Sequence, residues 1–188
     1  VAHNGTHVVA RQWCRRENAP AYTALLKTLP LPDLVTTDGH GGALKALHQL
    51  WPTAPAQRCL VHVHRNNIHD LTSRPNTEAG KALLALSRRL LTVSTKEEAA
   101  SWVKLLIEIN THYGDYLNER TYASQVPADQ LRKGRTWWYT HERDRKVYRR
   151  LASLHAKNHL FAFLDADPAR QRTTNPVESF NRQLRRAI

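Results

Sequence analysis

The sequence has 188 residues, 41% of them hydrophobic, which suits one domain, or a core with an inserted lobe. No apolar run approaches the roughly 20 residues of a membrane-spanning helix, and no charged-then-apolar leader is present, so we expect neither a membrane partner nor secretion. Two cysteines exclude a disulfide framework and favour a reducing, cytoplasmic location. Lys and Arg number 28 against 16 Asp and Glu, a net charge of +12, so a polyanion is the expected partner.

The first third of the chain predicts short strands that alternate with helices. Val1-Ala2 and His7–Cys14 flank Asn4-Gly5, a strong hairpin signal, so the chain is expected to start within a hairpin. Asn18 and Pro20 indicate the start of a helix that ends before Pro30. Further segments follow: a strand over 34–37, a helix around Leu44–Leu50, and an apolar run over 58–63 that could be a strand or a helix start.

The chain changes character after about residue 66, and no convincing strand is expected before about residue 170. Leucine-rich spacing predicts a helix over 78–92. Ser94-x-x-Glu97 forms a capping box that opens the next helix, and a further helix is expected over 141–157. The last segment, from Pro176, is helical again. The pattern is therefore α/β, with a long all-helical block.

Two basic stretches carry most of the net charge. Residues 132–150 hold eight basic and two acidic residues, and residues 170–188 hold five basic and one acidic. Clustered positive charge suits phosphate contacts, although a solvated helix face gives the same pattern. Trp137 and Trp138 lie inside the first stretch and could stack on bases, or simply pack. The candidate DNA-binding residues are Arg135, Trp137, Trp138, Arg143, Arg145, Lys146, Arg149, Arg182 and Arg185.

Two acids are candidates for metal-dependent chemistry. Asp38 follows a short apolar strand and precedes glycines and a helix, the position where open α/β sheets place their sites; a turn aspartate is the alternative. Glu178 follows Asn175-Pro176, so Asn175 as N-cap and Glu178 in the first turn could be a capping arrangement. Alternatively, Glu178 shares a helix face with Asn181, Arg182 and Arg185, which suits a metal beside a phosphodiester.

Cys59-x-x-His62 resembles half of a zinc site. Structural zinc usually takes four ligands, and no second Cys/His pair follows at finger spacing. We therefore do not expect zinc from the sequence.

Taken together, these segments resemble the catalytic portion of bacterial insertion-sequence transposases of the Mutator-like DDE group. The resemblance spans nearly the whole chain, and its motifs are specific through their order and spacing: Leu34–Gly39, Gln57–Asn66, Trp137–His141 and Thr174–Asn181. It implies a ribonuclease-H-like core with a helical insertion. The expected domains are residues 1–66 as the first part of the core, 67–169 as the insertion and 170–188 as the closing catalytic helix.

The resemblance also implies roles for single residues. Asp38 would be the second catalytic acid and Glu178 the last, both binding Mg²⁺ or Mn²⁺ in a two-metal site for DNA strand cleavage and transfer. Cys59, His62, Asn175 and Asn181 would belong to structural motifs. The first catalytic Asp and the DNA-reading domain of such transposases are expected to lie outside this sequence. The expected partner is double-stranded DNA at element ends and target, bound by a homodimer associated with the nucleoid.

Three alternatives remain open from the sequence. The chain could be a non-catalytic basic DNA-binding helical module, in which Asp38 is a turn residue and Glu178 a cap. It could be a different ribonuclease-H-like nuclease, although the long insertion argues against this. It could also be an interaction domain stabilised by zinc on Cys59 and His62.

Overall fold

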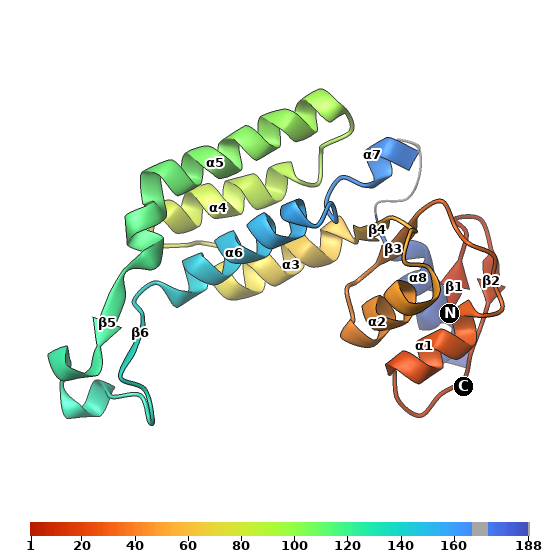
Figure 1. The fold of residues 1–188 in the computed structure, drawn as a ribbon, viewed down its shortest axis with the longest axis horizontal. Coiled ribbons are helices and arrows are strands. Elements are labelled where there is room, and N and C mark those ends of the chain that lie inside the picture. The colour runs from red at the N-terminus through yellow and green to blue at the C-terminus, as the bar shows by residue number, and fades with distance from the viewer. Residues whose placement is uncertain (167–172, 188) are drawn as a thin grey trace. The chain divides into compact units, whose positions relative to one another are not determined.

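The computed structural model describes residues 1–166 and 173–187, with side chains described up to residue 183. The chain is α/β, combining helices with small sheets (Figure 1). The strands are β1 (Ala2–His3), β2 (Val8–Ala10), β3 (Val35–Thr37), β4 (Ala56–Arg58), β5 (Arg120–Tyr122) and β6 (Trp137–Tyr139). The α-helices are α1 (Ala19–Leu26), α2 (Gly41–Leu50), α3 (Leu60–Leu71), α4 (Glu78–Arg89), α5 (Lys96–Asn118), α6 (Glu142–Ala156), α7 (Phe163–Ala166) and α8 (Asn175–Ala187).

The chain divides into two compact units. The first comprises residues 1–63 and 154–188, and the second comprises residues 64–153. The second unit is thus shorter than the segment expected over 67–169, because residues 154–166 belong with the first unit. Within the described residues the strands form three separate pairs: β1–β2 antiparallel, β3–β4 parallel and β5–β6 antiparallel.

The first unit begins with the hairpin that the sequence predicts. Asn4 accepts hydrogen bonds from the amides of Thr6 and His7 through Oδ1, and Gly5 supplies the positive φ of 102° that the turn needs. Asn18 caps α1 by accepting from the amide of Ala21 at 3.1 Å. Helices α1 and α2 then pack through a small apolar core of Leu26, Ala46 and Leu47, with Tyr22, Val35, Leu44, Leu50 and Trp51 packed against it.

In the second unit α3, α4, α5 and α6 lie side by side (Figure 1). Trp102 of α5 is fully buried, and its indole nitrogen donates to the carbonyl of Leu86 at 2.9 Å. Asp144 of α6 is also buried, and its Oδ2 accepts from the hydroxyls of Thr77 at 2.7 Å and Tyr116 at 2.9 Å. One carboxylate therefore joins the start of α4, the end of α5 and the start of α6.

The second unit also contains a β-ribbon, which corrects the expectation that this segment is all helical. Strands β5 and β6 pair with Thr121 opposite Trp138 and extend away from the helices (Figure 1). Threonine and aromatic residues favour a pleated strand, and Gly134 takes the positive φ of 71° in the connection. The sequence interpretation missed the ribbon because each strand has only three residues.

The capping box at the start of α5 differs from the one that the sequence predicts. The start of α5 uses Thr95 and Glu98, not Ser94 and Glu97, although both pairs have the required spacing. Ser94 instead donates to Glu98 through its amide and its hydroxyl. The sequence alone could not choose between two overlapping boxes.

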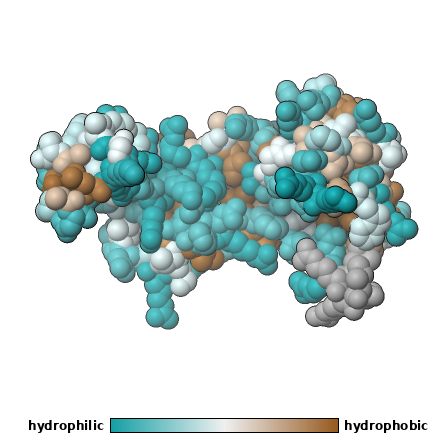
Figure 2. Space-filling model, turned by 90° about the horizontal axis from the view of Figure 1, so that it is seen from below, coloured by the Kyte–Doolittle hydropathy of each residue, from teal (hydrophilic) through white to brown (hydrophobic). Residues whose placement is uncertain are grey.

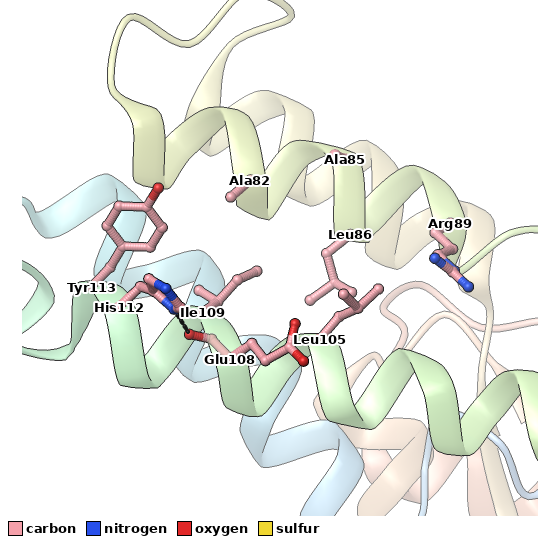
Figure 3. A pocket seen from close by; sticks show the side chains of 9 residues that line it. All are labelled: Ala82, Ala85, Leu86, Arg89, Leu105, Glu108, Ile109, His112 and Tyr113. Atoms are coloured by element: carbon pink, nitrogen blue, oxygen red, sulfur yellow. Dashed lines mark hydrogen bonds between the residues drawn. The ribbon is translucent and has the colours of Figure 1, made fainter.

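A shallow groove runs between α4 and α5 of the second unit (Figure 3). Its lining residues are Ala82, Ala85, Leu86, Arg89, Leu105, Glu108, Ile109, His112 and Tyr113. His112 is bonded to the carbonyl of Glu108 in its own helix at 3.0 Å. None of the candidate catalytic, metal-binding or DNA-binding residues lines this groove. Among the described residues, no helix is long and apolar enough to cross a membrane.

Asp70, at the end of α3, is the buried member of an ion-pair cluster in the second unit. Its carboxylate is 9% exposed and accepts from Lys146 at 2.8 Å and from Arg150, both on α6, while His69 lies 3.7 Å away. Burial raises the pKa of Asp70, but the hydrogen bonds and charges of Lys146 and Arg150 outweigh it and bring the pKa below the ordinary 3.8. The ionised carboxylate therefore stabilises the packing of α3 against α6.

We expect Asp70→Asn to lower the free energy of unfolding at pH 7 by about 1–3 kcal/mol, because two cations lose a charged acceptor. A lowered folded-state pKa contributes stability above the unfolded value of 3.8, and that stability is lost as pH falls through the folded pKa. The difference between wild type and variant should therefore shrink below pH 3.8, measured by urea unfolding across pH. Asp115→Asn, on the exposed surface of α5, is the control; a pH-independent difference for Asp70→Asn would contradict this account.

Candidate active site

Asp38 lies directly after β3, at the carboxyl end of the parallel pair. β3 and β4 pair with Val35 opposite Ala56 and Thr37 opposite Arg58. Asp38 is exposed, and its Oδ1 accepts from the amide of His40 at 2.9 Å. This bond gives Asp38 the local turn role considered from the sequence, and it also fixes the orientation of the carboxylate.

Arg58 holds the loop that carries Asp38. Its Nη2 donates to the carbonyl of Asp38 at 2.6 Å. Gly39 has φ of 88°, and a Cβ at this residue would lie 1.8 Å from the guanidinium carbon of Arg58. The loop therefore requires glycine for two reasons, its backbone conformation and the space that the arginine occupies.

The hydroxyl of Tyr22 lies near the carboxylates of Glu17 and Asp38. Burial raises the pKa of the Tyr22 hydroxyl, which donates to Glu17 at 3.1 Å, and the charges of Glu17 and Asp38 raise it further. Both carboxylates therefore stabilise the protonated hydroxyl of Tyr22.

His159 belongs to the same unit. Burial lowers the pKa of His159, and the positive charges of Arg58 and Lys157 lower it further.

The amide of Cys59 joins the two strands at the point where they end. It donates to the carbonyl of Thr37 at 2.8 Å, and the carbonyl of Cys59 accepts from Val63 in the first turn of α3. The undecided run over 58–63 is therefore the end of a strand followed immediately by a helix. Asp38 therefore comes directly after the acceptor residue, Thr37, and the Cys59-x-x-His62 motif begins with the donor residue, Cys59.

Glu178 of α8 reaches the same motif from the far end of the sequence. The ligand atoms of Cys59, His62 and Glu178 all lie within 4.8 Å of one another. Oε1 of Glu178 is 3.6 Å from Nδ1 of His62, and the two side chains are 33% and 28% exposed. The sequence placed these residues in separate motifs, and the fold brings them together. Asp38 is not a member of this cluster.

Thr174 organises the cluster, and the sequence interpretation did not assign it a role. Its hydroxyl donates to Oε1 of Glu178 at 2.8 Å, and its amide donates to Sγ of Cys59 at 3.3 Å. The amide of Glu178 bonds the carbonyl of Thr174, so Thr174 is the N-cap of α8, and Asn175 is its first helical residue. This corrects the expected cap at Asn175. The signal was present in the sequence, because a threonine before Asn-Pro is itself a good cap.

Gln57 is a second residue that the sequence did not reveal. It is fully buried at the centre of β4, where its Nε2 donates to the carbonyls of Arg58 and Leu160 at 2.7 and 2.9 Å. Its Oε1 accepts from the amide of Phe163 at 3.3 Å. These bonds attach β4 to the segment that precedes α7. A single glutamine in a three-residue strand carries no pattern that would predict this.

The basic residues of α6 belong to the second unit. Arg143, Lys146 and Arg149 are exposed and follow one another at spacings of three, so they lie along one flank of the helix. Lys146 also pairs with Asp70. Arg145 points elsewhere: it donates to the carbonyl of Leu117 at 3.1 Å.

The tryptophans of the β5–β6 ribbon differ in exposure. Trp138 is 6% exposed and has Arg132 over its ring at 4.9 Å, so it packs within the ribbon and offers no free face. Trp137 is 36% exposed, with Arg120 over its ring at 4.2 Å. Arg135 lies 3.7 Å from Glu142. The space-filling view shows a small apolar patch at the ribbon end, surrounded by hydrophilic residues (Figure 2).

The remaining predicted residues lie on α8. Arg182 is exposed and Asn181 is half-buried. The side chain of Arg185 lies outside the described part of the chain, as do the basic residues Arg170 and Arg172.

The chain matches one known protein family. A family model described as transposase, Mutator family, matches residues 8–108, which is more than half of the chain. The chain belongs to the Mutator family of transposases. Its function is therefore related to DNA transposition. The matched residues include Asp38, Cys59 and His62, whereas Glu178 and α6 lie beyond them. No curated protein and no solved structure matches the chain.

Gly39→Ala should destabilise the loop that carries Asp38. A non-glycine residue in this backbone region costs about 1–3 kcal/mol, and the guanidinium of Arg58 must also move. Gly41→Ala is the matched control, because a Cβ there meets nothing within 4 Å. Thermal unfolding of both variants tests this: an equal melting temperature for wild type and Gly39→Ala would show that the loop does not depend on the close approach of Arg58.

Proposed function

We propose that the chain is the catalytic part of a DDE transposase, in which Asp38 and Glu178 serve metal-dependent strand cleavage and strand transfer. Each reaction displaces an oxygen at a phosphodiester, first with water and then with a 3′-hydroxyl as nucleophile. The proposal includes a ribonuclease-H-like core formed by the first and last segments of the chain, with the segment around α4, α5 and α6 inserted between them.

One chain of contacts carries the proposal. Glu178 lies beside Cys59 and His62, the amide of Cys59 bonds to Thr37, and Asp38 follows Thr37. Two acids that are far apart in sequence thus belong to one region, at the carboxyl end of a parallel strand pair.

The donor atoms suit a hard divalent cation. Mg²⁺ and Mn²⁺ prefer carboxylate oxygens, and the carboxylates of Asp38 and Glu178 are each fixed by a hydrogen bond from a neighbouring residue. Asp38 and Glu178 would hold such ions, which would supply activation of the attacking oxygen and stabilisation of the leaving oxygen. The protein residues do the positioning: Thr174 fixes Oε1 of Glu178, and Arg58 fixes the loop of Asp38.

DNA contacts follow from the distribution of exposed basic residues. Arg143 and Arg149 offer guanidinium groups to phosphates along α6, and Arg182 does so on α8. Trp137 is more exposed than Trp138 and is therefore the better candidate for base stacking, although Arg120 already covers part of its ring. The proposed ligand is double-stranded DNA at element ends and target, held by a homodimer as the family resemblance implies.

Glu178→Gln should abolish strand cleavage by the transposase that carries these residues and leave DNA binding within about twofold, because the amide keeps the shape but loses the charged ligand. Cleavage of a labelled element-end duplex with Mg²⁺ or Mn²⁺ measures the first effect, and a gel-shift titration the second. Glu97→Gln, on the exposed surface of α5, is the control. If Glu178→Gln still cleaves DNA, Glu178 has no catalytic role. That result would favour the alternative in which this chain is a non-catalytic DNA-binding module.

The double variant Arg143→Ala/Arg149→Ala should weaken DNA binding equally for different sequences. Each lost phosphate contact reduces the slope of log affinity against log salt by about 0.9, so the slope should fall by about 2. Fluorescence anisotropy at several salt concentrations measures it. Lys104→Ala, on the exposed surface of α5, is the control with an unchanged slope. An unchanged slope for the double variant would place the DNA elsewhere.

A further inference from the structure

We propose that Cys59, His62 and Glu178 form a binding site for a thiophilic divalent cation, Zn²⁺ in particular, with water as the fourth ligand. Local spacing in the sequence identifies only two of the ligands and shows no second Cys/His pair of a zinc finger. The third ligand is a carboxylate more than a hundred residues downstream, which no local spacing could reveal. The site shares Glu178 with the hard-metal chemistry proposed above, but it differs in its other ligands, because it uses Cys59 and His62 and not Asp38.

The donor set suits zinc rather than magnesium. A thiolate, an imidazole and a carboxylate are each ordinary zinc ligands, and a thiolate is a poor ligand for Mg²⁺. Three protein ligands and one open position is the usual composition of a zinc site that keeps a water molecule. Cys59 is fully buried, whereas His62 and Glu178 are partly exposed, so the open position would face solvent.

The distances fit with small side-chain movements. Donor atoms about 2.0–2.3 Å from a tetrahedral zinc ion lie roughly 3.3–3.8 Å from each other. Nδ1 of His62 and Oε1 of Glu178 are already 3.6 Å apart. Sγ of Cys59 lies within 4.8 Å of one ligand atom of each of these residues.

Thr174 provides independent support, because it makes hydrogen-bond contacts to all three ligands; its hydroxyl oxygen lies 3.4 Å from Nδ1 of His62. Its amide donates to Sγ of Cys59, and its hydroxyl donates to Oε1 of Glu178. Amide donors to a thiolate and hydroxyl donors to a ligating carboxylate are the outer contacts that orient metal ligands. Thr174 is also the N-cap of α8, so the cation would link the first turn of α8 to the first turn of α3.

Cobalt(II) binding to the metal-free 188-residue chain tests the proposal. We expect one equivalent of Co²⁺ to give the visible bands of a tetrahedral site and a thiolate-to-cobalt charge-transfer band, both removed by Zn²⁺ but not by excess Mg²⁺. Cys59→Ser should remove the charge-transfer band. Cys14→Ser and His69→Gln, at exposed residues outside the cluster, should leave the spectrum unchanged. Absence of the charge-transfer band in the wild type would overturn the proposal.

Two further variants cover the case in which Cys59→Ser does not fold. His62→Gln and Glu178→Gln alter partly exposed side chains, and each should weaken Co²⁺ binding at least tenfold. Thr174→Val keeps the amide but loses the hydroxyl, and should weaken it by about 10–100-fold. Unchanged Co²⁺ affinity in Glu178→Gln would overturn the assignment of the carboxylate as a ligand.

Asp38→Asn separates this inference from the proposed function, since the two share Glu178. The variant should keep the full Co²⁺ spectrum while the transposase that carries it loses strand cleavage. A lost spectrum in Asp38→Asn would overturn the three-ligand site, whereas retained cleavage would contradict only the catalytic role of Asp38.

Discussion

The hydrogen bond from the amide of Cys59 to the carbonyl of Thr37 is the contact on which the candidate site depends. It continues the parallel pairing of β3 and β4 by one residue, so that two loops leave the sheet side by side. One loop carries Asp38, and the other begins α3 with Cys59 and His62. β4 ends at Arg58 and α3 begins at Leu60, so the motif starts directly between a strand and a helix.

Two side chains make that arrangement stable within the first unit. Gln57 satisfies the carbonyls of Arg58 and Leu160 and the amide of Phe163 from a fully buried position, where unpaired polar groups would be costly. Thr174 then attaches the start of α8 to Cys59 and fixes Glu178. The side-chain amide of Gln57 connects β4 to the segment before α7. Thr174 connects the start of α8 to Cys59, the residue before α3. Both residues are polar, and both connect separate segments of the first unit through hydrogen bonds.

In the second unit, buried carboxylates connect separate helices in a similar way. Asp144 receives hydroxyl groups from α4 and α5, and Asp70 receives the cations of α6. Part of the basic charge of α6 therefore serves packing, while Arg143 and Arg149 remain exposed. Net charge by itself could not separate these two uses. The same distinction applies to the ribbon, where Trp138 is buried and its neighbour Trp137 is partly exposed.

The sequence by itself determined the α/β order of the first third, the helices of the second unit and the family, because periodicity, caps and motif order are local properties. It also identified Asp38, Cys59, His62 and Glu178 as separate candidates. Only the tertiary structure decided that Glu178 meets Cys59 and His62, that Thr174 rather than Asn175 caps α8, and that three-residue strands form a ribbon in a helical region. These features depend on contacts between residues far apart in the chain. Such contacts are selected by packing and by hydrogen-bond satisfaction, and neither leaves a periodic signal in the sequence.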